Sequence, residues 1–449
     1  MLALRGGLPM IGSTEMERVE CIVVGGGLAG LSAAYGLAAS GHEVMVLERG
    51  DYPGAKNVTG GRLYLKPLQA IYPELWPEAP FERAVTRELV TMIGDQAQTT
   101  LEIAPGKVSG QSPQSHTVLR ARLDRWLAER ASDKGAMVLS NMKVDALLRE
   151  KSMGGQGRVV GIRAGDDEIA ADVVIVAEGV LGLLSTKAGL RDGPGPRQYA
   201  LGYKEVIELP AHVIEDRWHL NAGEGAAQLF MGDITKQMTG GGFLYTNKES
   251  ISLGLVVGLE QLSTRGDDLE SWQLLDEFKK LPSVQPLVAG GTVVEYSAHS
   301  IAEGGISQVP QLYGDGYMLA GDAASLSLNA LFTVRGMDFA IASGFYAAKT
   351  AAECLEVRDT SAAALSSYDS RLRHSFVLRD LQTARAVPHL LENPRLFSHY
   401  PEAICRLLAD IYNVGPGPSR KLSSRVLHAL RRDFLSIATV KDLWSLHKV

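Results

Sequence analysis

Cysteine is scarce in this chain of 449 residues, which contains only Cys21, Cys354 and Cys405. The three lie far apart and form no C-x-x-C pair, which excludes a disulfide framework and a four-thiolate iron–sulfur cluster within the chain. The net charge of −6 gives no reason to expect nucleic-acid binding. The sequence contains no recognisable Ser–His–Asp set and no metal-ligand cluster, so we predict no catalytic nucleophile and no metal site.

A membrane-spanning run is also missing. The uncharged run from Cys21 to Gly41 is long enough to suggest a membrane helix, but five glycines interrupt it. Residues 1–16 lack the apolar region of a signal peptide and are interpreted as a disordered extension. The predicted location is therefore the cytoplasm.

What the sequence does contain is a dinucleotide-binding unit between Val19 and Gly50. A β-branched strand precedes Gly25-x-Gly27-x-x-Gly30, and a small-residue helix and a second strand ending in Glu48 follow. Gly25 allows a tight turn, Gly27 lets the backbone approach a pyrophosphate, and Gly30 lets the helix pack close to the sheet. Glu48 can accept hydrogen bonds from ribose hydroxyls, which favours FAD or NAD over NADP.

Later segments are predicted to return to the same site. The loop from Gly54 to Tyr64 follows the second strand and therefore lies at the carboxyl edge of the sheet, where ligands bind. A helix over Val118–Ala131, a buried strand over Ala170–Ala177 and a second strand ending in Gly-Asp reach the same edge. The candidate cofactor residues in these segments and beside Glu48 are Arg49, Lys56, Asn57, Thr59, Gly60, Gly61, Arg120, Glu178, Gly179, Gly321, Asp322, Arg335, Gly336 and Met337.

The pattern predicts an α/β fold with a mostly antiparallel second sheet and a helical C-terminal region, and the order of its segments resembles that of FAD-binding proteins of the glutathione-reductase/hydroxylase type. Strand patterns dominate from Ala200 to Glu303, and Thr99 to His116 is polar without an apolar plateau. The expected division, with the FAD and quinone roles implied by the family resemblance given next, is a disordered extension (1–16), the first part of the FAD-binding domain (17–196), an antiparallel-sheet quinone or substrate domain (197–306), the second part of the FAD-binding domain (307–350) and a helical region (351–449).

Several long motifs resemble one family. GGGLAGLSAAYGLAASGHEVMVLERG, VVIVAEG and YMLAGDAA occur in the order typical of glutathione-reductase/hydroxylase-type FAD proteins. GAKNVTGGRLY, GYKEVIELP, GGGFLYTN, VEYSAH and FTVRGMDFAIASG resemble the FixC branch of the electron-transfer-flavoprotein–quinone oxidoreductase (ETF-QO) family. The resemblance runs from about Glu20 to the C-terminus.

This resemblance implies an FAD-containing oxidoreductase that takes electrons from an electron-transfer flavoprotein of the FixA/FixB type. It also implies delivery to quinone, to a ferredoxin-like FixX partner, or to both, in a family that includes electron-bifurcating systems. Gly240 and Gly241 match the glycine pair whose backbone approaches the quinone. Lys56 and Arg335 match positions that would stabilise anionic reduced flavin, and the amides around Gly336 and Met337 would face the flavin N1/O2 side.

Two departures from the family matter. Larger members carry a cysteine-rich cluster domain that this chain lacks, so a cluster must come from another polypeptide. The segment that corresponds to their membrane-inserting loop is the polar Thr99–His116 stretch, which leaves peripheral attachment to the inner face of the membrane as the alternative to a purely cytoplasmic location. The rival functions are a geranylgeranyl-reductase-like or monooxygenase-type flavoenzyme for a lipid or aromatic substrate, and a scaffold that keeps FAD structurally.

Overall fold

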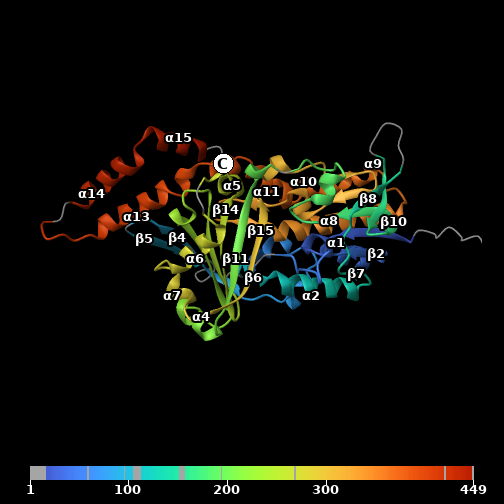
Figure 1. Cartoon of the computed structure of the whole chain (residues 1–449), viewed down its shortest axis with the longest axis horizontal. Coiled ribbons are helices and arrows are strands. Elements are labelled where there is room, and N and C mark those ends of the chain that lie inside the picture. Colours follow the sequence, from blue (N-terminus) through green and yellow to red (C-terminus); the bar gives the residue numbers. More distant parts are fainter. Residues whose placement is uncertain are drawn as a thin grey trace, which may run out of the picture.

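The computed structural model describes residues 17–57, 60–95, 97–104, 113–150, 157–193, 195–266, 269–418 and 421–446. Two sheets organise these residues, and a group of C-terminal helices extends from one end (Figure 1). The predicted extension over residues 1–16 and the candidate residue Thr59 lie outside the described residues.

The first sheet forms around the predicted dinucleotide-binding unit. Its strand order is β16-β17-β10-β1-β2-β7, and β9 and β8 continue it beyond β10 by antiparallel pairing. The strands are β1 (Arg18–Val24), β2 (Val44–Leu47), β7 (Met137–Leu139), β8 (Ala146–Arg149), β9 (Val159–Ala164), β10 (Asp167–Val176), β16 (Tyr313–Gly314) and β17 (Tyr317–Leu319). The inner strands run parallel and are buried on both faces, which explains their continuous Val, Ile and Leu runs.

Parallel pairing brings four strand ends to one edge of this sheet. Gly25 follows β1, Glu48 follows β2, Glu178 follows β10, and Asp322 follows β17. Helix α1 (Leu28–Ala39) begins at this edge and packs against α8 (Met337–Glu356). The two helices approach so closely that a Cβ on Gly344 would lie 2.1 Å from the carbonyl oxygen of Ala29, so α8 needs a glycine there.

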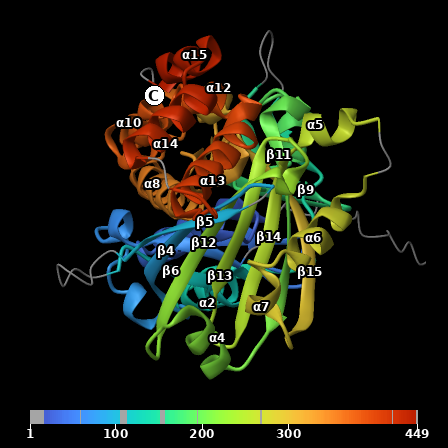
Figure 2. The ribbon, with the colours of Figure 1, turned by 90° about the vertical axis from the view of Figure 1, so that its left-hand side faces the viewer.

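The second sheet has the order β15-β11-β14-β13-β12-β4-β6-β3, with β5 paired to β4. Its strands are β3 (Gly60–Tyr64), β4 (Ala84–Ile93), β5 (Gln98–Ile103), β6 (Ser115–Leu119), β11 (Tyr199–Glu208), β12 (Glu224–Gly232), β13 (Gly240–Thr246), β14 (Ser250–Gly258) and β15 (Thr292–Ala302). Only β12 and β4 pair in parallel among these described strands. Figure 2 shows the strands side by side with α4 (Ala211–Trp218), α6 (Ser271–Lys280) and α7 (Gln285–Val288) around them.

One expectation about this region was wrong, because the predicted loop over Gly54–Tyr64 becomes a strand, β3, from Gly60. The polar stretch from Thr99 begins in strand β5 and ends in β6. Strands β3, β4, β5 and β6 therefore belong to the second sheet, although they lie within the segment expected to form the first part of the FAD-binding domain. Pairing of β4 with β12 and of β3 with β6 satisfies backbone groups whose partners are far away in sequence, so local pattern does not reveal them.

The predicted helix over Val118–Ala131 is α2 (Arg120–Asp133), which begins two residues later because Val118 and Leu119 complete β6. The remaining helices are α3 (Leu183–Lys187), α5 (Leu259–Thr264), α9 (Ala362–Leu365), α10 (Ser367–His374), α11 (Phe376–Thr383), α12 (Val387–Leu391), α13 (His399–Tyr412), α14 (Leu422–Ala429) and α15 (Ile437–Leu446). Within the described parts of the chain, no helix is both long and apolar enough to span a bilayer.

Candidate functional site

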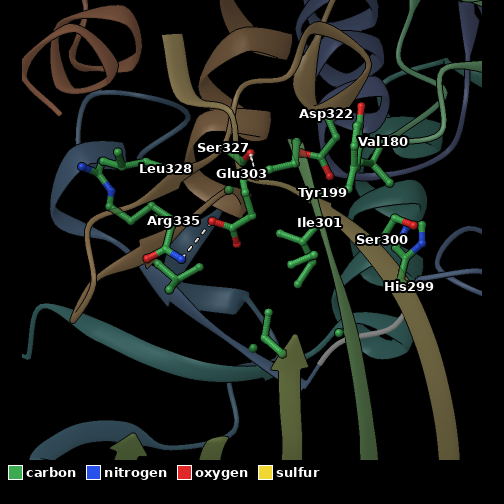
Figure 3. Close-up of a pocket in the computed structure, with 18 of the residues that line it drawn as sticks. Val180, Tyr199, His299, Ser300, Ile301, Glu303, Asp322, Ser327, Leu328 and Arg335 are labelled. Atoms are coloured by element: carbon green, nitrogen blue, oxygen red, sulfur yellow. Dashed lines mark hydrogen bonds between the residues drawn. The ribbon is translucent and has the colours of Figure 1, made fainter. Parts of the chain in front are cut away.

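A cavity of about 890 Å³ lies where the strand ends of the first sheet meet the second sheet. Its lining includes Gly25, Gly27, Glu48 and Asp322 from the first sheet's edge, together with Gly240 to Phe243 from β13. Figure 3 shows Val180, Tyr199, Ile301, Glu303 and Asp322 around its open centre. This volume falls within the range of pockets that bind small molecules and cofactors.

The three fingerprint glycines are required for different reasons. A Cβ on Gly25 would lie 2.4 Å from the Ala177 carbonyl oxygen, and one on Gly30 would lie 2.0 Å from the Gly25 carbonyl oxygen. A Cβ on Gly27 would meet nothing closer than 3.8 Å. The protein itself therefore has room for a side chain at Gly27, and the space beside it suits a ligand that approaches the backbone. Gly27 also precedes α1, whose first N–H groups lack partners within the helix and favour an anion.

Glu48 is held in place by the backbone. Its Oε2 accepts a hydrogen bond from the Gly26 N–H at 2.7 Å, and its Oε1 accepts one from the Gly50 N–H at 2.6 Å. Each carboxylate oxygen can accept a further bond, so Glu48 can still bind ribose hydroxyls. The two backbone bonds fix the orientation in which it would do so.

Arg120 is anchored at the first position of α2. Its Nε and Nη2 donate to the two oxygens of the fully buried Asp124 at 2.6 and 2.7 Å, and the amide of Asn57 donates to Asp124 at 2.5 Å. Burial lowers the pKa of the Arg120 guanidinium, but Asp124 and Asp322 more than offset this, so the pKa lies above its usual value. Arg120 is thus a permanent, rigid cation on the cavity wall.

Asp322 follows β17 and also lines the cavity. Burial raises the pKa of its carboxyl group, and the positive charges of Arg120 and Arg191 oppose that change. Within the described residues, no protein group makes a hydrogen bond to its carboxylate, so it remains able to accept bonds from the hydroxyls of a ligand.

Glu178 makes two hydrogen bonds to the backbone that follows it. Its two carboxylate oxygens accept hydrogen bonds from the N–H groups of Leu184 and Ser185 at 2.7 and 2.6 Å. The side chain therefore caps the start of α3, as carboxylates often do at helix N-termini. Glu178 and Gly179 line the cavity, and each Glu178 carboxylate oxygen, like those of Glu48, can accept a further hydrogen bond.

Arg335 is less available than predicted for stabilising a negative flavin. Its guanidinium is paired with the buried Asp338 at 2.5 Å and with Asp380 at 2.5 Å. The adjacent Gly336 lines the cavity with Met337, and a Cβ on Gly336 would meet nothing closer than 3.9 Å. As with Gly27, the protein itself leaves space at Gly336 for a group that approaches the start of α8.

Packing within the second sheet requires glycine at both positions of the pair on β13, Gly240 and Gly241. Gly240 has a φ of +135°, and a Cβ there would lie 1.9 Å from the Val256 carbonyl oxygen. A Cβ on Gly241 would lie 2.7 Å from the Phe230 carbonyl oxygen. Packing within the sheet thus accounts for both residues without a ligand. Both nevertheless line the cavity.

Most of the predicted cofactor residues share this one cavity. Arg49, Lys56, Asn57 and Gly61 line it with the residues described above, and Arg49 and Lys56 are exposed. Gly30 and Gly321 lie outside the lining, and Gly30 is buried in helix packing. The roles of these residues in binding a cofactor remain predictions.

Sequence reasoning missed three titratable residues of the second sheet that reach the cavity. Lys204 of β11 is 2% exposed, and burial lowers the pKa of its amine although the Glu295 carboxylate lies 3.4 Å away. Burial also lowers the pKa of His299 on β15, with further lowering from Arg120 and Arg49. The third is Glu303, just beyond β15. Strand alternation alone could not identify these positions, because it does not tell which face meets the cofactor.

Three parts of the chain match family models. Residues 20–76 match the model described as FAD dependent oxidoreductase, residues 199–301 match ETF-QO, ubiquinone-binding, and residues 387–449 match ETF-QO/FixC family C-terminal domain. The second match contains Gly240, Gly241 and Lys204.

Whole-length relatives agree with these matches. The chain is 43% identical over 422 residues to a probable electron transfer flavoprotein-quinone oxidoreductase, YdiS, of Escherichia coli, covering 94% of this chain and 97% of the relative. It is 42% identical to protein FixC of Escherichia coli over 424 residues, with the same coverage. It is 41% identical over 411 residues to protein FixC of Bradyrhizobium diazoefficiens, covering 90% and 92% of the two chains.

Solved structures share the fold at low identity. A geranylgeranyl bacteriochlorophyll reductase-like protein from Thermoplasma acidophilum aligns with a TM-score of 0.71 at 20% identity, over 96% of this chain and all of that one. The myxobacterial FAD-dependent halogenase CndH aligns with a TM-score of 0.62 at 20% identity, covering 92% and 97% of the two chains. The predicted fold of FAD-binding oxidoreductases is confirmed.

Proposed function

The chain belongs to the FixC/ETF-QO family of FAD-dependent oxidoreductases, and from that premise we propose that it accepts electrons from an electron-transfer flavoprotein and passes them to quinone, to a ferredoxin-like partner, or to both. FAD is its cofactor, and when bound it would supply the redox chemistry. The electron-transfer role follows from the family. The identities of the electron donor, the electron acceptor and the partner proteins are what we propose.

One observation supports the quinone step most directly. The candidate FAD residues and the part of β13 that lies within the ubiquinone-binding match line a single cavity. A flavin and a quinone ring held in one cavity would be close enough to exchange electrons without an intervening carrier. The protein's contribution is to position both rings and to exclude water, rather than to supply a nucleophile.

The requirement for partners is supported by what this chain does not carry. Among the described residues, no group of three or more Cys, His, Asp and Glu side chains could hold a metal, and all three cysteines are free and buried. An iron–sulfur centre in this relay would therefore belong to another polypeptide, as we propose for a FixX-type ferredoxin. Electrons would enter from a FixA/FixB-type flavoprotein.

Membrane contact, if quinone is the acceptor, would be peripheral. A lipid-soluble quinone has to enter the cavity from a membrane, and the β4–β5 hairpin carries the exposed apolar side chains Leu101 (57%) and Ile103 (56%). Flotation of the protein with vesicles of Escherichia coli lipid, compared with a Leu101→Ser/Ile103→Ser variant, tests this contact. Loss of flotation in the variant supports it, and absence of flotation in the wild type contradicts it.

The donor is tested by rapid mixing under anaerobic conditions. Reduced FixAB-type flavoprotein is mixed with the oxidised protein, and bleaching of the flavin absorbance is followed. The proposal predicts rapid bleaching by the flavoprotein and none by NADPH. Direct reduction by NADPH would instead favour a monooxygenase or prenyl-reductase function, for which the shared fold alone gives no specific support. A flavin that neither donor reduces would favour a structural role for FAD.

A further inference from the structure

Glu303 occupies a distinctive place in the cavity. It follows the last residue of β15 and lines the same space as Gly240, Gly241 and Asp322. Figure 3 shows its carboxylate directed towards the open centre, near Ile301. The side chain keeps part of its surface open to that space.

Hydrogen bonds hold the backbone in place at three successive residues, Ala302, Glu303 and Gly304. The N–H of Glu303 donates to the Gln198 carbonyl oxygen at 2.9 Å. The Ser327 hydroxyl donates to the Ala302 carbonyl oxygen at 2.9 Å, and the Gly304 N–H donates to the Gln308 side-chain oxygen at 2.8 Å. A carboxylate presented from such a corner has a defined position, which proton transfer requires.

The partner of the Glu303 carboxylate is neutral. Its Oε2 accepts a hydrogen bond from the Asn329 amide at 2.9 Å, and the Asn329 oxygen accepts one from the Leu331 N–H at 3.0 Å, which keeps the amide N–H₂ turned towards Glu303. No salt bridge and no other hydrogen bond from a described residue reaches this carboxylate. Burial raises the pKa of Glu303 to about 7, and the Asn329 bond opposes that change. The group can therefore hold and release a proton near neutral pH.

The other carboxylates on the cavity wall lack this combination. Glu48 and Glu178 each bind two backbone N–H groups, Glu392 pairs with Arg197, and Asp322 lies in the field of two arginines. Besides the acids already named, the titratable and charged side chains that line the cavity from the surrounding elements are Arg49, Lys56, Arg62, Arg120, Arg197, Tyr199, Tyr203, Lys204, Tyr245, Glu260, His299, Arg335, Arg385 and His389. Arg335 is already paired with Asp338 and Asp380.

We propose that Glu303 is the proton donor for the acceptor reduced in this cavity, giving one proton to a quinone oxygen as the flavin gives the electrons. This inference rests on the proposed function, because it requires a quinone in the cavity. With FAD bound, the reduced flavin would supply two electrons and one proton to the quinone. The Glu303 carboxylic acid gives the second proton, which completes the quinol, and becomes a carboxylate that solvent reprotonates.

The test uses FAD-loaded wild-type protein, Glu303→Gln and the matched control Glu260→Gln, an exposed glutamate on the same cavity. Glutamine keeps an acceptor for Asn329 but carries no exchangeable acid. Each protein is photoreduced without oxygen and mixed with a short-chain ubiquinone analogue or with ferrocenium, which accepts an electron without a proton. Reoxidation by the quinone should fall about 10²- to 10⁴-fold in Glu303→Gln only, and reoxidation by ferrocenium should be unchanged in all three.

Two further readouts separate a proton donor from a structural residue. The wild-type quinone reaction should slow as pH rises through about 7, and this step should vanish in Glu303→Gln. The infrared carbonyl band of a protonated carboxylic acid should disappear across the same pH range in the wild type, and this change should be absent from the variant.

The outcomes are distinct. A Glu303→Gln protein with the wild-type quinone rate and pH profile, or with an equal loss towards ferrocenium, overturns the role of Glu303. A wild-type flavin that ferrocenium oxidises but quinone does not overturns the proposed quinone function, and the role of Glu303 with it.

Discussion

Two glycines that line the cavity differ in what the protein's own packing requires. Around the Gly25-x-Gly27-x-x-Gly30 motif, here called the fingerprint region, the protein leaves room for a side chain at Gly27. In the second sheet, packing requires a glycine at Gly240 of β13. A Cβ on Gly27 would meet nothing closer than 3.8 Å, whereas a Cβ on Gly240 would lie 1.9 Å from a carbonyl oxygen. The carboxylates differ in a parallel way, because Glu48 binds two backbone N–H groups and Glu303 binds one neutral amide. The first region is arranged to hold a ligand still, and the second leaves an acid free to change its protonation state.

The largest expected effect comes from filling the space beside Gly27. We expect Gly27→Val to fold but to be purified without FAD, because valine would occupy the position of the pyrophosphate while leaving the chain's own packing intact. The ratio of flavin absorbance to protein absorbance measures this. Gly415→Val, where a Cβ meets no atom within 4 Å, is the control and should keep its flavin. Full flavin content in Gly27→Val would falsify the assignment of the fingerprint region.

Replacing Arg120 tests how much the buried ion pair between Arg120 and Asp124 contributes to the stability of the protein. Arg120→Ala would leave the fully buried Asp124 without its cation, which should lower the free energy of unfolding by about 3–5 kcal/mol. Urea unfolding measures the change. Adding Asp124→Asn should recover part of it, and equal stability of the single and double variants would contradict this explanation.

The raised pKa of Glu303 has a consequence for stability. The folded protein holds this proton up to about pH 7, whereas the unfolded chain loses it near the ordinary value of 4.5. Between these values the native state binds more protons, so wild-type stability should fall as pH rises, by a few kcal/mol at most. Unfolding of FAD-loaded wild type and Glu303→Gln at several pH values measures the difference. A parallel pH dependence in both proteins would contradict the burial of this acid.

The smallest expected effect concerns Glu178. Because its carboxylate caps α3, Glu178→Ala should cost about 0.5–2 kcal/mol of stability and leave FAD bound. Thermal unfolding and flavin content together test this. A variant of unchanged stability that loses its flavin would contradict the capping role of Glu178 and support its predicted role in cofactor binding.

The central strands of the first sheet could be predicted from the sequence. The strand predicted to end in Glu48 is β2, and the one predicted over Ala170–Ala177 is β10 (Asp167–Val176), because the local pattern indicates strand, glycine turn and helix. Strands β7 and β16 of the same sheet were not predicted. The sequence did not reveal that β3 to β6 join the second sheet. Strand β4 pairs with β12, which lies more than a hundred residues away, and β3 pairs with β6 in a register that the local pattern does not determine. The same limit applies to the site, where Lys204, His299 and Glu303 were missed because the face of a strand that meets the cavity is set by long-range packing.

The central claim is that flavin and quinone exchange electrons within one cavity, and anaerobic reoxidation of the photoreduced wild-type flavin by a short-chain ubiquinone analogue tests it most directly. The account predicts that the oxidised flavin spectrum returns at a rate that rises with quinone concentration and saturates, as binding in a cavity requires. A flavin that stays reduced with quinone, yet is oxidised at once by ferrocenium, would contradict the account.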